Sequence, residues 1–151
     1  MVKEEGEMKK NLGLMLQIGG NGNLNKGFQQ CVIRADGFPY FSDLKDNECH
    51  IILVPHYVEH LKPWEVIRFM SECWRILKVN GQLAISTPYA GSPGWWSDPT
   101  HCTGWNEHSF AYFDPDFEAY NHYKPKPWKI EKGNPIWQNT GNLECLLRPR
   151  K

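Results

Sequence analysis

Ionisable side chains that can bind a ligand or transfer a proton stand close together at His56, Glu59 and His60. They directly follow an apolar run, Ile51–Val54, and would lie at the carboxyl end of that strand. Histidine and glutamate in that place could orient a substrate or accept a proton, and His60 is a candidate for substrate contact. The spacing i, i+3, i+4 also suits metal ligands on a helix, but no third ligand follows at a recognisable offset, so we predict no metal site. The alternative is a capping or structural role for Glu59 and His60.

A second candidate for acid–base chemistry is His101 together with Asp98. An aspartate three residues before a histidine can fix the tautomer of the imidazole and leave its other nitrogen for the substrate. The competing interpretation is that Asp98 caps a turn against the backbone of Thr100 or His101, a common role of an Asp-Pro-Thr sequence. The sequence leaves both open. The candidate catalytic residues are therefore His101, Asp98 and His56.

The elements that would position these residues form a strand–helix–strand unit in the middle of the chain. Ile51–Val54 is a β-branched and aliphatic run of the kind that is buried on both faces of a parallel sheet. Pro63 opens a helix whose apolar residues recur at helical spacing, and Asn80-Gly81 supplies its left-handed stop. Leu83–Thr87 is the next strand. Such a unit must be parallel and right-handed, and ligands of its sheet bind beyond the carboxyl ends of the strands.

A glycine-rich loop follows the first predicted strand, Leu12–Ile18. The loop, Gly19–Asn23, allows the backbone to turn sharply and approach a ligand closely, although surface turns have the same composition. Cys31–Arg34 is a short second strand, and Asp36 follows it. The distance from the loop to Asp36 is close to that at which an acidic residue binds ribose hydroxyls in dinucleotide folds. A solvated Asp-Gly turn is the alternative.

A long polar and aromatic loop begins at Tyr89, after the last strand of the unit, where loops often carry function. Its aromatic residues Tyr89, Trp95 and Trp96 could line a substrate pocket, or they could bury against the sheet edge or a second subunit. A short helix is predicted across Glu107–Phe113, capped by Asn106 or Thr103.

Two further strands are predicted near the end of the sequence, at Trp128–Glu131 and Leu143–Arg148. Antiparallel pairing of these two strands would complete the sheet.

Length and composition indicate a single domain spanning 1–151, with a flexible start at 1–11. A formal net charge of zero argues against a nucleic-acid binder that works through a broad basic field. No apolar run approaches the length of a membrane span, and the acidic start lacks the apolar stretch of a signal peptide. The five cysteines are never in CxxC spacing, so we predict a cytoplasmic protein with reduced thiols and no structural zinc.

Several segments resemble, in order, the motifs of class I S-adenosylmethionine-dependent methyltransferases of the small methyltransferase-domain type. The glycine loop is similar to the first motif of that family, and the cluster at His56 is similar to its HVLEH segment. The matching segments are Leu16–Asn23 with Gly27-Phe28, Ala35-Asp36 with Phe38-Pro39, His56–Leu61, Trp74–Leu83 (similar to RVLKPGG-x-L), and Asp98–His101 with Phe110 and Tyr112-Phe113. Together they cover nearly the whole chain, and the stretch 56–113 is the most specific part.

The resemblance implies an α/β fold: a Rossmann-like methyltransferase sheet, mostly parallel with an antiparallel C-terminal strand pair, and reduced in helices. It also implies S-adenosylmethionine as the cofactor. The residues that would hold the cofactor are Gln17, Gly19, Gly20, Asn21, Gly22, Asp36 and His56, and those that would contact the acceptor are Tyr89, Trp95, Trp96 and His60.

The chain departs from the family pattern on the cofactor side. Gln17 stands where the family usually has an acid, and His50 where it usually has an aspartate. The segment between Phe28 and Asp36 is also shorter than usual. An amide such as that of Gln17 can form hydrogen bonds but cannot form a salt bridge with the ammonium of the cofactor.

Three functions are compatible with these residues. The first is methyl transfer to a small molecule or to a small group on a polymer. The second is a catalytically degenerate methyltransferase fold that acts as a binding or assembly module, with a homo-oligomer or a partner covering exposed aromatic side chains. The third is a different enzyme that uses His101, Asp98 or His56 on a non-methyl substrate. The sequence does not identify the methyl acceptor, and neither a membrane nor nucleic acid is indicated as a partner.

Overall fold

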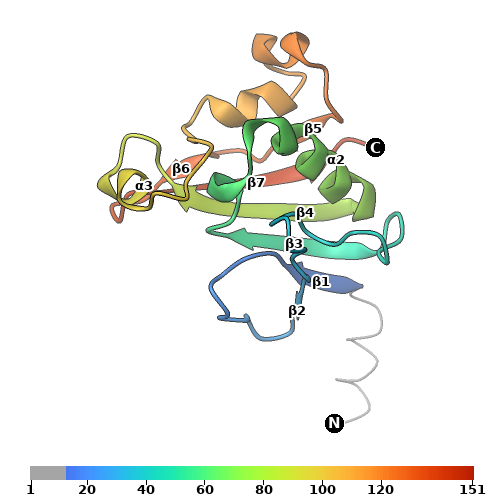
Figure 1. The fold of residues 1–151 in the computed structure, drawn as a ribbon. Coiled ribbons are helices and arrows are strands. Elements are labelled where there is room, and N and C mark those ends of the chain that lie inside the picture. Colours follow the sequence, from blue (N-terminus) through green and yellow to red (C-terminus); the bar gives the residue numbers. More distant parts are fainter. Residues whose placement is uncertain (1–12) are drawn as a thin grey trace, which may run out of the picture.

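The computed structural model describes residues 13–151, so the predicted flexible start at 1–11 lies outside the described part. A single twisted sheet runs through the molecule (Figure 1). Its strand order is β2-β1-β3-β4-β7-β5, and β6 also pairs with β7. The strands are β1 (Leu14–Gln17), β2 (Gln29–Gln30), β3 (Cys49–Pro55), β4 (Leu77–Pro88), β5 (Trp128–Ile130), β6 (Ile136–Trp137) and β7 (Asn142–Pro149).

The sheet has a parallel part and an antiparallel part. Strands β2, β1, β3 and β4 pair parallel to one another. Strand β7 then pairs antiparallel with β4, and β5 and β6 pair antiparallel with β7. This arrangement confirms the predicted fold class, including the antiparallel strands that complete the sheet. The short strand β6 was not predicted.

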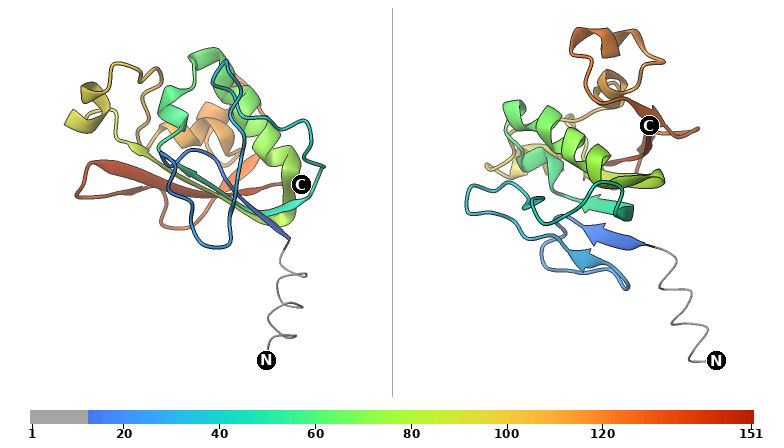
Figure 2. Two further views of the ribbon diagram at one scale, coloured as in Figure 1. Left: turned by 60° about the horizontal axis from the view of Figure 1, so that its bottom comes forward. Right: turned by 90° about the vertical axis from the view of Figure 1, so that its right-hand side faces the viewer.

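The main helix, α2 (Val66–Ile76), connects β3 to β4 and packs on one face of the sheet (Figure 2). It buries Phe69, Met70, Cys73 and Ile76. The other helical segments are short: α3 (Pro93–Ser97) and 3₁₀ turns at Val58–His60, Pro63–Glu65, Ser109–Phe113 and Glu118–His122. No helix among residues 13–151 is long and apolar enough to cross a membrane.

Strand β3 is covered fully on one face only, which corrects the prediction that it is buried on both. Ile52 and Val54 are completely buried, whereas Ile51 and Leu53 between them are half-buried. The same alternation runs along β7. The helices of the described part lie together on one side of the sheet (Figure 2), and the aliphatic run therefore packs as a one-sided strand.

The end of α2 also differs from the prediction. The helix stops at Ile76, because Leu77 is extended (φ −71°, ψ 142°) and pairs with Cys49 of β3. Asn80 and Gly81 lie inside β4, and neither has a positive φ. A Cβ on Gly81 would lie 2.9 Å from the carbonyl oxygen of Lys78, so glycine is required there for close packing and not for a left-handed turn.

Two other predicted elements are displaced or shortened. The second strand is Gln29–Gln30 and not Cys31–Arg34, because the chain turns back at 34–38 and Ile33 forms an isolated bridge with Pro39. The helix predicted across Glu107–Phe113 is a 3₁₀ turn over Ser109–Phe113. The side chain of Asn106 accepts a hydrogen bond from the backbone N–H of His108 just before it (2.9 Å).

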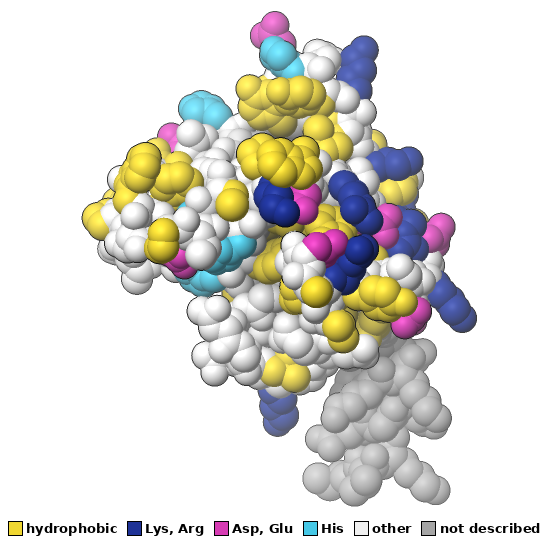
Figure 3. All heavy atoms as spheres, in the orientation of Figure 1, with side chains coloured by type: hydrophobic (Ala, Val, Ile, Leu, Met, Phe, Trp, Pro, Cys, Tyr) yellow, Lys and Arg dark blue, Asp and Glu magenta, His cyan; other side chains and the backbone are white. Residues whose placement is uncertain are grey.

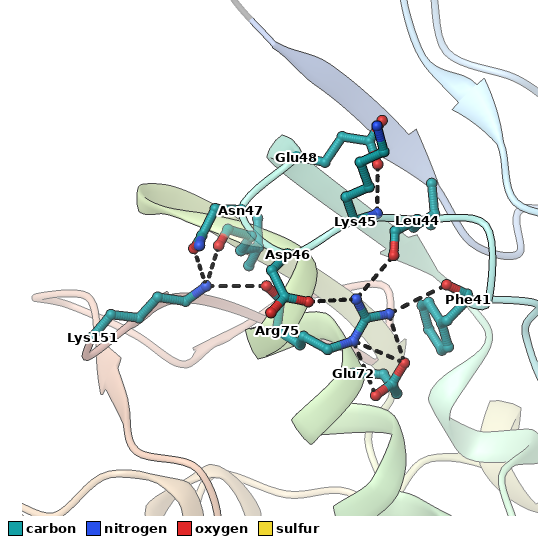
Figure 4. A network of polar contacts seen from close by, with 10 residues as sticks. Phe41, Leu44, Lys45, Asp46, Asn47, Glu48, Glu72, Arg75 and Lys151 are labelled. Atoms are coloured by element: carbon teal, nitrogen blue, oxygen red, sulfur yellow. Dashed lines mark hydrogen bonds and ion pairs between the residues drawn. The ribbon is translucent and has the colours of Figure 1, made fainter.

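Charged side chains of both signs are mixed on the face of the molecule shown in Figure 3. One charged group has a structural role: the guanidinium of Arg75 on α2 holds the loop before β3 (Figure 4). It donates hydrogen bonds to the carbonyl oxygens of Phe41 (3.3 Å) and Leu44 (2.9 Å). It also pairs with Asp46 (2.8 Å) and Glu72 (3.0 Å).

We expect Arg75→Lys to lower the free energy of unfolding by about 2 kcal/mol, because a lysine ammonium cannot reproduce the fork of donors that satisfies two loop carbonyls and two carboxylates. Urea denaturation followed by circular dichroism measures the change. Arg68→Lys is the matched control, since Arg68 lies on the same helix but is exposed and only covers the ring of Phe38. Equal losses in the two variants would contradict the role of Arg75.

Candidate functional site

A polar cavity of about 360 Å³ lies at the carboxyl ends of β3 and β4. Histidine side chains gather there beside an acidic side chain, at the left of the molecule in Figure 3. The cavity combines residues from the glycine loop, the end of β3, the loop after β4 and the start of β7. The lining residues are Asn21, His56, Glu59, His60, Pro88, Ser92, Gly94, Asp98, His101, Thr140, Gly141 and Asn142.

His56 is held at the first position after β3 in a left-handed backbone conformation, with φ +48°. Its backbone N–H donates to the carbonyl oxygen of Ser86 (2.8 Å), which fixes this turn against β4. A non-glycine residue in this region stores strain, and such strain is concentrated at functional sites. The turn directs the imidazole into the cavity, where Nδ1 lies 3.5 Å from the carboxylate of Glu59. The interaction with Glu59 raises the pKa of His56, and partial burial opposes the increase.

Glu59 is the buried centre of the site, with 1% of its side chain exposed. The hydroxyl of Thr87, at the end of β4, donates to its Oε2 (3.0 Å). The backbone carbonyl of Glu59 accepts hydrogen bonds from the N–H groups of Cys102 (2.7 Å) and Thr103 (3.0 Å). Glu59 therefore joins the strand ends to the loop that carries His101.

The side chain of His101 is 5% exposed, and its Nδ1 lies 2.7 Å from the carbonyl oxygen of Trp95. Asp98 does not hold this nitrogen: its Oδ2 lies 3.6 Å from Nε2, and its Oδ1 accepts from the backbone N–H (2.8 Å) and hydroxyl (2.7 Å) of Thr100. Asp98 thus caps the turn, and the Trp95 carbonyl orients the imidazole.

His60 approaches the same place from the other side. Its Nδ1 lies 3.1 Å from the hydroxyl oxygen of Thr100, and its ring packs edge-on against His101 with centroids 4.9 Å apart. The sequence alone predicted no third ligand to accompany Glu59 and His60. The fold brings His101, 40 residues or more away along the chain, beside these two residues.

No family model and no curated protein matches the sequence. Solved structures do match. An S-adenosylmethionine-dependent methyltransferase from Archaeoglobus fulgidus superposes over 97% of this chain and 90% of its own, with a TM-score of 0.62 and 17% identity. A putative type 11 methyltransferase from Sulfolobus solfataricus covers 100% of this chain and 93% of its own (TM-score 0.61, 16% identity). The mitomycin 7-O-methyltransferase MmcR matches 98% of this chain with 53% of its own (TM-score 0.60, 14% identity).

This chain has the fold of the S-adenosylmethionine-dependent methyltransferases. The similarity extends over nearly the full described length, so the methyltransferase fold includes the antiparallel strands β5 and β7 as well as the parallel part. The polar cavity lies where ligands of open α/β sheets bind, beyond the carboxyl ends of the parallel strands.

Within this methyltransferase fold, Gln17 uses its hydrogen-bonding groups inside its own loop. The side-chain nitrogen donates to the carbonyl oxygens of Gly19 (3.3 Å) and Asn23 (2.6 Å). The side-chain oxygen accepts from the backbone N–H (3.0 Å) and the amide (2.8 Å) of Asn25. The residue is completely buried and faces the loop, not the cavity.

The glycine loop has a packed base, Gly19 and Gly20, and an open tip, Asn21 and Gly22. Gly19, Gly20, Asn21 and Gly22 all have positive φ. A Cβ on Gly20 would lie 2.5 Å from the Gln17 amide nitrogen, and one on Gly19 would lie within 3 Å of β3, whereas Gly22 has open space around it. The tip, Asn21 and Gly22, is therefore the part that can approach a ligand, and Asn21 lines the cavity.

Asp36, the predicted ribose ligand, lies away from the cavity lining. One carboxylate oxygen accepts from the backbone N–H of Phe38 (3.0 Å), and the other pairs with Arg34 (3.0 Å). Among the predicted cofactor residues, Asn21 and His56 line the cavity. These two fit a polar cofactor bound at the strand ends, and Gln17 and Asp36 do not face it.

The predicted acceptor residues occupy different environments. His60 lines the cavity, and Trp95 stands behind His101 with ring centroids 6.0 Å apart. Trp96 is 73% exposed, and Tyr89 lines a separate hollow that includes Glu107. The structure thus places His60 in the lining of the cavity and Trp95 behind His101, outside the lining, and it places Tyr89 and Trp96 away from the cavity.

Several residues of the site were not singled out from the sequence. Asn142 is one of them, and its amide lies 3.4 Å from Nε2 of His56. It reaches the cavity because β7 pairs with β4 in a register that puts it opposite Pro88. Thr87 donates a hydrogen bond to Glu59. Its position at the end of a predicted strand could have identified it as a site residue, whereas no local sequence pattern identifies Asn142 as one.

Cysteine reactivity provides a test of the packing around the site. Burial raises the pKa of Cys31 to about 11 and of Cys49 to about 12, and it also raises the pKa of Cys73 and Cys145. A raised pKa means less thiolate at pH 8, so these thiols should be inert, whereas the exposed Cys102 should react. We expect a thiol reagent such as Ellman's reagent to label one cysteine in the folded protein, and Cys102→Ser to abolish that fast phase. Rapid labelling of several thiols in the folded variant would contradict this packing.

Proposed function

We propose that the cavity supports S-adenosylmethionine-dependent methyl transfer to a small polar molecule or to a small group on a polymer. One observation carries the proposal: the tip of the glycine loop and the acid–base groups at the strand ends open into the same cavity. A cofactor bound by the loop would therefore lie next to groups that can accept a proton. The cavity volume of about 360 Å³ is in the range of small-molecule sites.

In this proposal Asn21 and His56 hold the cofactor side of the cavity. The cofactor would supply an electrophilic methyl group. The residues of the chain would mainly align the acceptor and remove its proton where needed. His56 is suited to this role because its Nδ1 faces Glu59, which leaves Nε2 directed toward the amide of Asn142 and the cavity.

Calorimetric titration of the protein with S-adenosylmethionine tests the proposal. We expect saturable binding to the wild type and about tenfold weaker binding to Asn21→Ala, which removes a polar contact worth about 1.4 kcal/mol. Asn121→Ala is the control, since Asn121 is exposed on the 3₁₀ turn Glu118–His122, outside the cavity lining. Absence of any heat from the wild type at high protein concentration would overturn the proposal.

The second candidate is a methyltransferase fold that serves as a binding module without transfer. It is favoured by one observation, namely that Gln17 and Asp36 are engaged by their own segments and not by the cavity. Under this alternative the wild type shows no cofactor affinity, and size-exclusion chromatography gives an oligomer or a complex. Tight cofactor binding by a strict monomer would exclude it.

A further inference from the structure

We propose that Glu59, His60 and His101 form a binding site for a divalent first-row transition metal, with Zn²⁺ as the best match. One ligand atom from each of these three residues lies within 4.8 Å of the other two. The residues come from two segments, the 3₁₀ turn Val58–His60 and the loop after β4, and the loop is held in place by hydrogen bonds to the Glu59 carbonyl. Backbone hydrogen bonds of the fold thus hold the two segments together, with Glu59 buried and His60 exposed.

Hydrogen bonds on the outer side of each imidazole set its tautomer. The Nδ1 of His101 faces the carbonyl oxygen of Trp95, which can only accept, so this nitrogen carries the proton. The Thr100 hydroxyl donates to Asp98 and must therefore accept from the Nδ1 of His60. In both neutral rings the proton is on Nδ1, and Nε2 keeps its lone pair. Metal-ligating histidines are oriented in this way by carbonyl or carboxylate partners behind them.

The buried carboxylate of Glu59 has a single imidazole, that of His56, beside it among its nearest polar partners. Its side chain is 1% exposed, and its nearest polar partners are the hydroxyl of Thr87 at 3.0 Å and the imidazole of His56 at 3.5 Å. A buried carboxylate is costly unless its charge is compensated, and metal coordination is one of the ways in which proteins compensate such a charge, in addition to a partner such as His56. A cation between Glu59 and the two histidines would supply that compensation.

Two histidines and one carboxylate are the ligand set of zinc sites that keep an open coordination position. Tetrahedral coordination at about 2.0–2.2 Å brings the ligand atoms to about 3.4 Å from one another. They now lie within 4.8 Å of one another, so they must close by up to about 1.4 Å. All three residues line the polar cavity, so water or a ligand oxygen in the cavity could complete the coordination. The metal site requires neither the glycine loop nor the cofactor, so it is independent of the proposed methyl transfer.

The test is calorimetric titration of the chelator-treated, full-length protein with Zn²⁺, together with the visible absorption spectrum of the Co²⁺-loaded protein. We expect one ion per chain in the wild type and a Co²⁺ spectrum of low coordination number. Glu59→Gln preserves the shape and the hydrogen bond from Thr87. Since loss of an outer-shell partner alone weakens metal binding 10–100-fold, loss of this ligand should weaken Zn²⁺ binding by about 100-fold or more.

Two control variants separate this site from other metal-binding groups. His122→Gln removes a histidine outside the site, and Cys102→Ser removes the exposed thiol near it, and neither should alter Zn²⁺ affinity. His60→Gln is the second ligand variant, and it should fold without difficulty because His60 is exposed. The proposal is overturned if the folded wild type takes up no Zn²⁺, if Glu59→Gln and His60→Gln bind as tightly as the wild type, or if binding is lost in a control variant. Titration with S-adenosylmethionine is a separate experiment, so failure of one proposal is distinguished from failure of the other.

Discussion

Replacing Gly19 with alanine is expected to lower the free energy of unfolding by about 3 kcal/mol, the sum of a left-handed backbone penalty of about 1 kcal/mol and an overpacking cost of about 2 kcal/mol. Gly19 has φ +90°, and a Cβ there would lie 2.7 Å from the carbonyl oxygen of Pro55 and 2.8 Å from Cβ of Tyr57. Pro55 is the last residue of β3, Tyr57 follows two residues later, and neither atom can move without disturbing the site. Urea denaturation followed by circular dichroism measures the loss.

Gly22→Ala is the matched control in the same loop. Gly22 has a similar backbone conformation, with φ +83°, but open space surrounds its missing Cβ. Only the backbone penalty should therefore appear, about 1 kcal/mol. Equal losses at Gly19 and Gly22 would mean that the base of the loop is not packed against β3. The pair of variants thus separates the structural role of the glycines from any role in ligand binding.

Asp114→Ala is expected to lower the free energy of unfolding by about 3 kcal/mol, because a buried acceptor of several hydrogen bonds is removed and a buried donor loses its partner. Asp114 is completely buried. Its Oδ2 accepts from the backbone N–H of Ile130 in β5 (2.8 Å), and its Oδ1 accepts from Arg150 (2.7 Å) and from the N–H of Asp116 (3.0 Å). The carboxylate therefore fixes the 3₁₀ turn at Ser109–Phe113 to the antiparallel strands.

Asp116→Ala is the control for Asp114. Asp116 also pairs with Arg150 (2.8 Å) and with Lys129, but nearly half of its side chain is exposed. Ion pairs at exposed positions contribute about 0–1 kcal/mol, so the loss should be small. Thermal or urea unfolding of the two variants under one set of conditions makes the comparison. A loss at Asp116 as large as that at Asp114 would show that charge alone, and not the buried hydrogen bonds, stabilises this connection.

Local patterns in the sequence predict most of the scaffold. The apolar run before His56 and the helical spacing after Pro63 are properties of short windows, and a strand and a helix form there. The strand is buried on one face only, and α2 begins at Val66 after a 3₁₀ turn at Pro63–Glu65. The end of the helix was predicted incorrectly, because Asn80-Gly81 has the composition of a stop signal. Leu77 pairs with β3, so the backbone changes from helix to strand before Asn80-Gly81, where no local signal indicates an end of the helix. Strand pairing outweighs local propensity at that point.

By itself the sequence determined the strand–helix–strand unit, the place of the glycine loop and the cluster of ionisable residues after β3. The tertiary structure decided which of these residues meet. In the folded chain the side chain of Gln17 forms hydrogen bonds within its own loop. The pairing of β4 and β7 brings Asn142 to His56, and His101 lies beside Glu59 and His60. The physical reason is that periodicity and spacing record contacts between near neighbours in the chain. The third histidine reaches Glu59 through a loop held by backbone hydrogen bonds, which have no signature in the sequence.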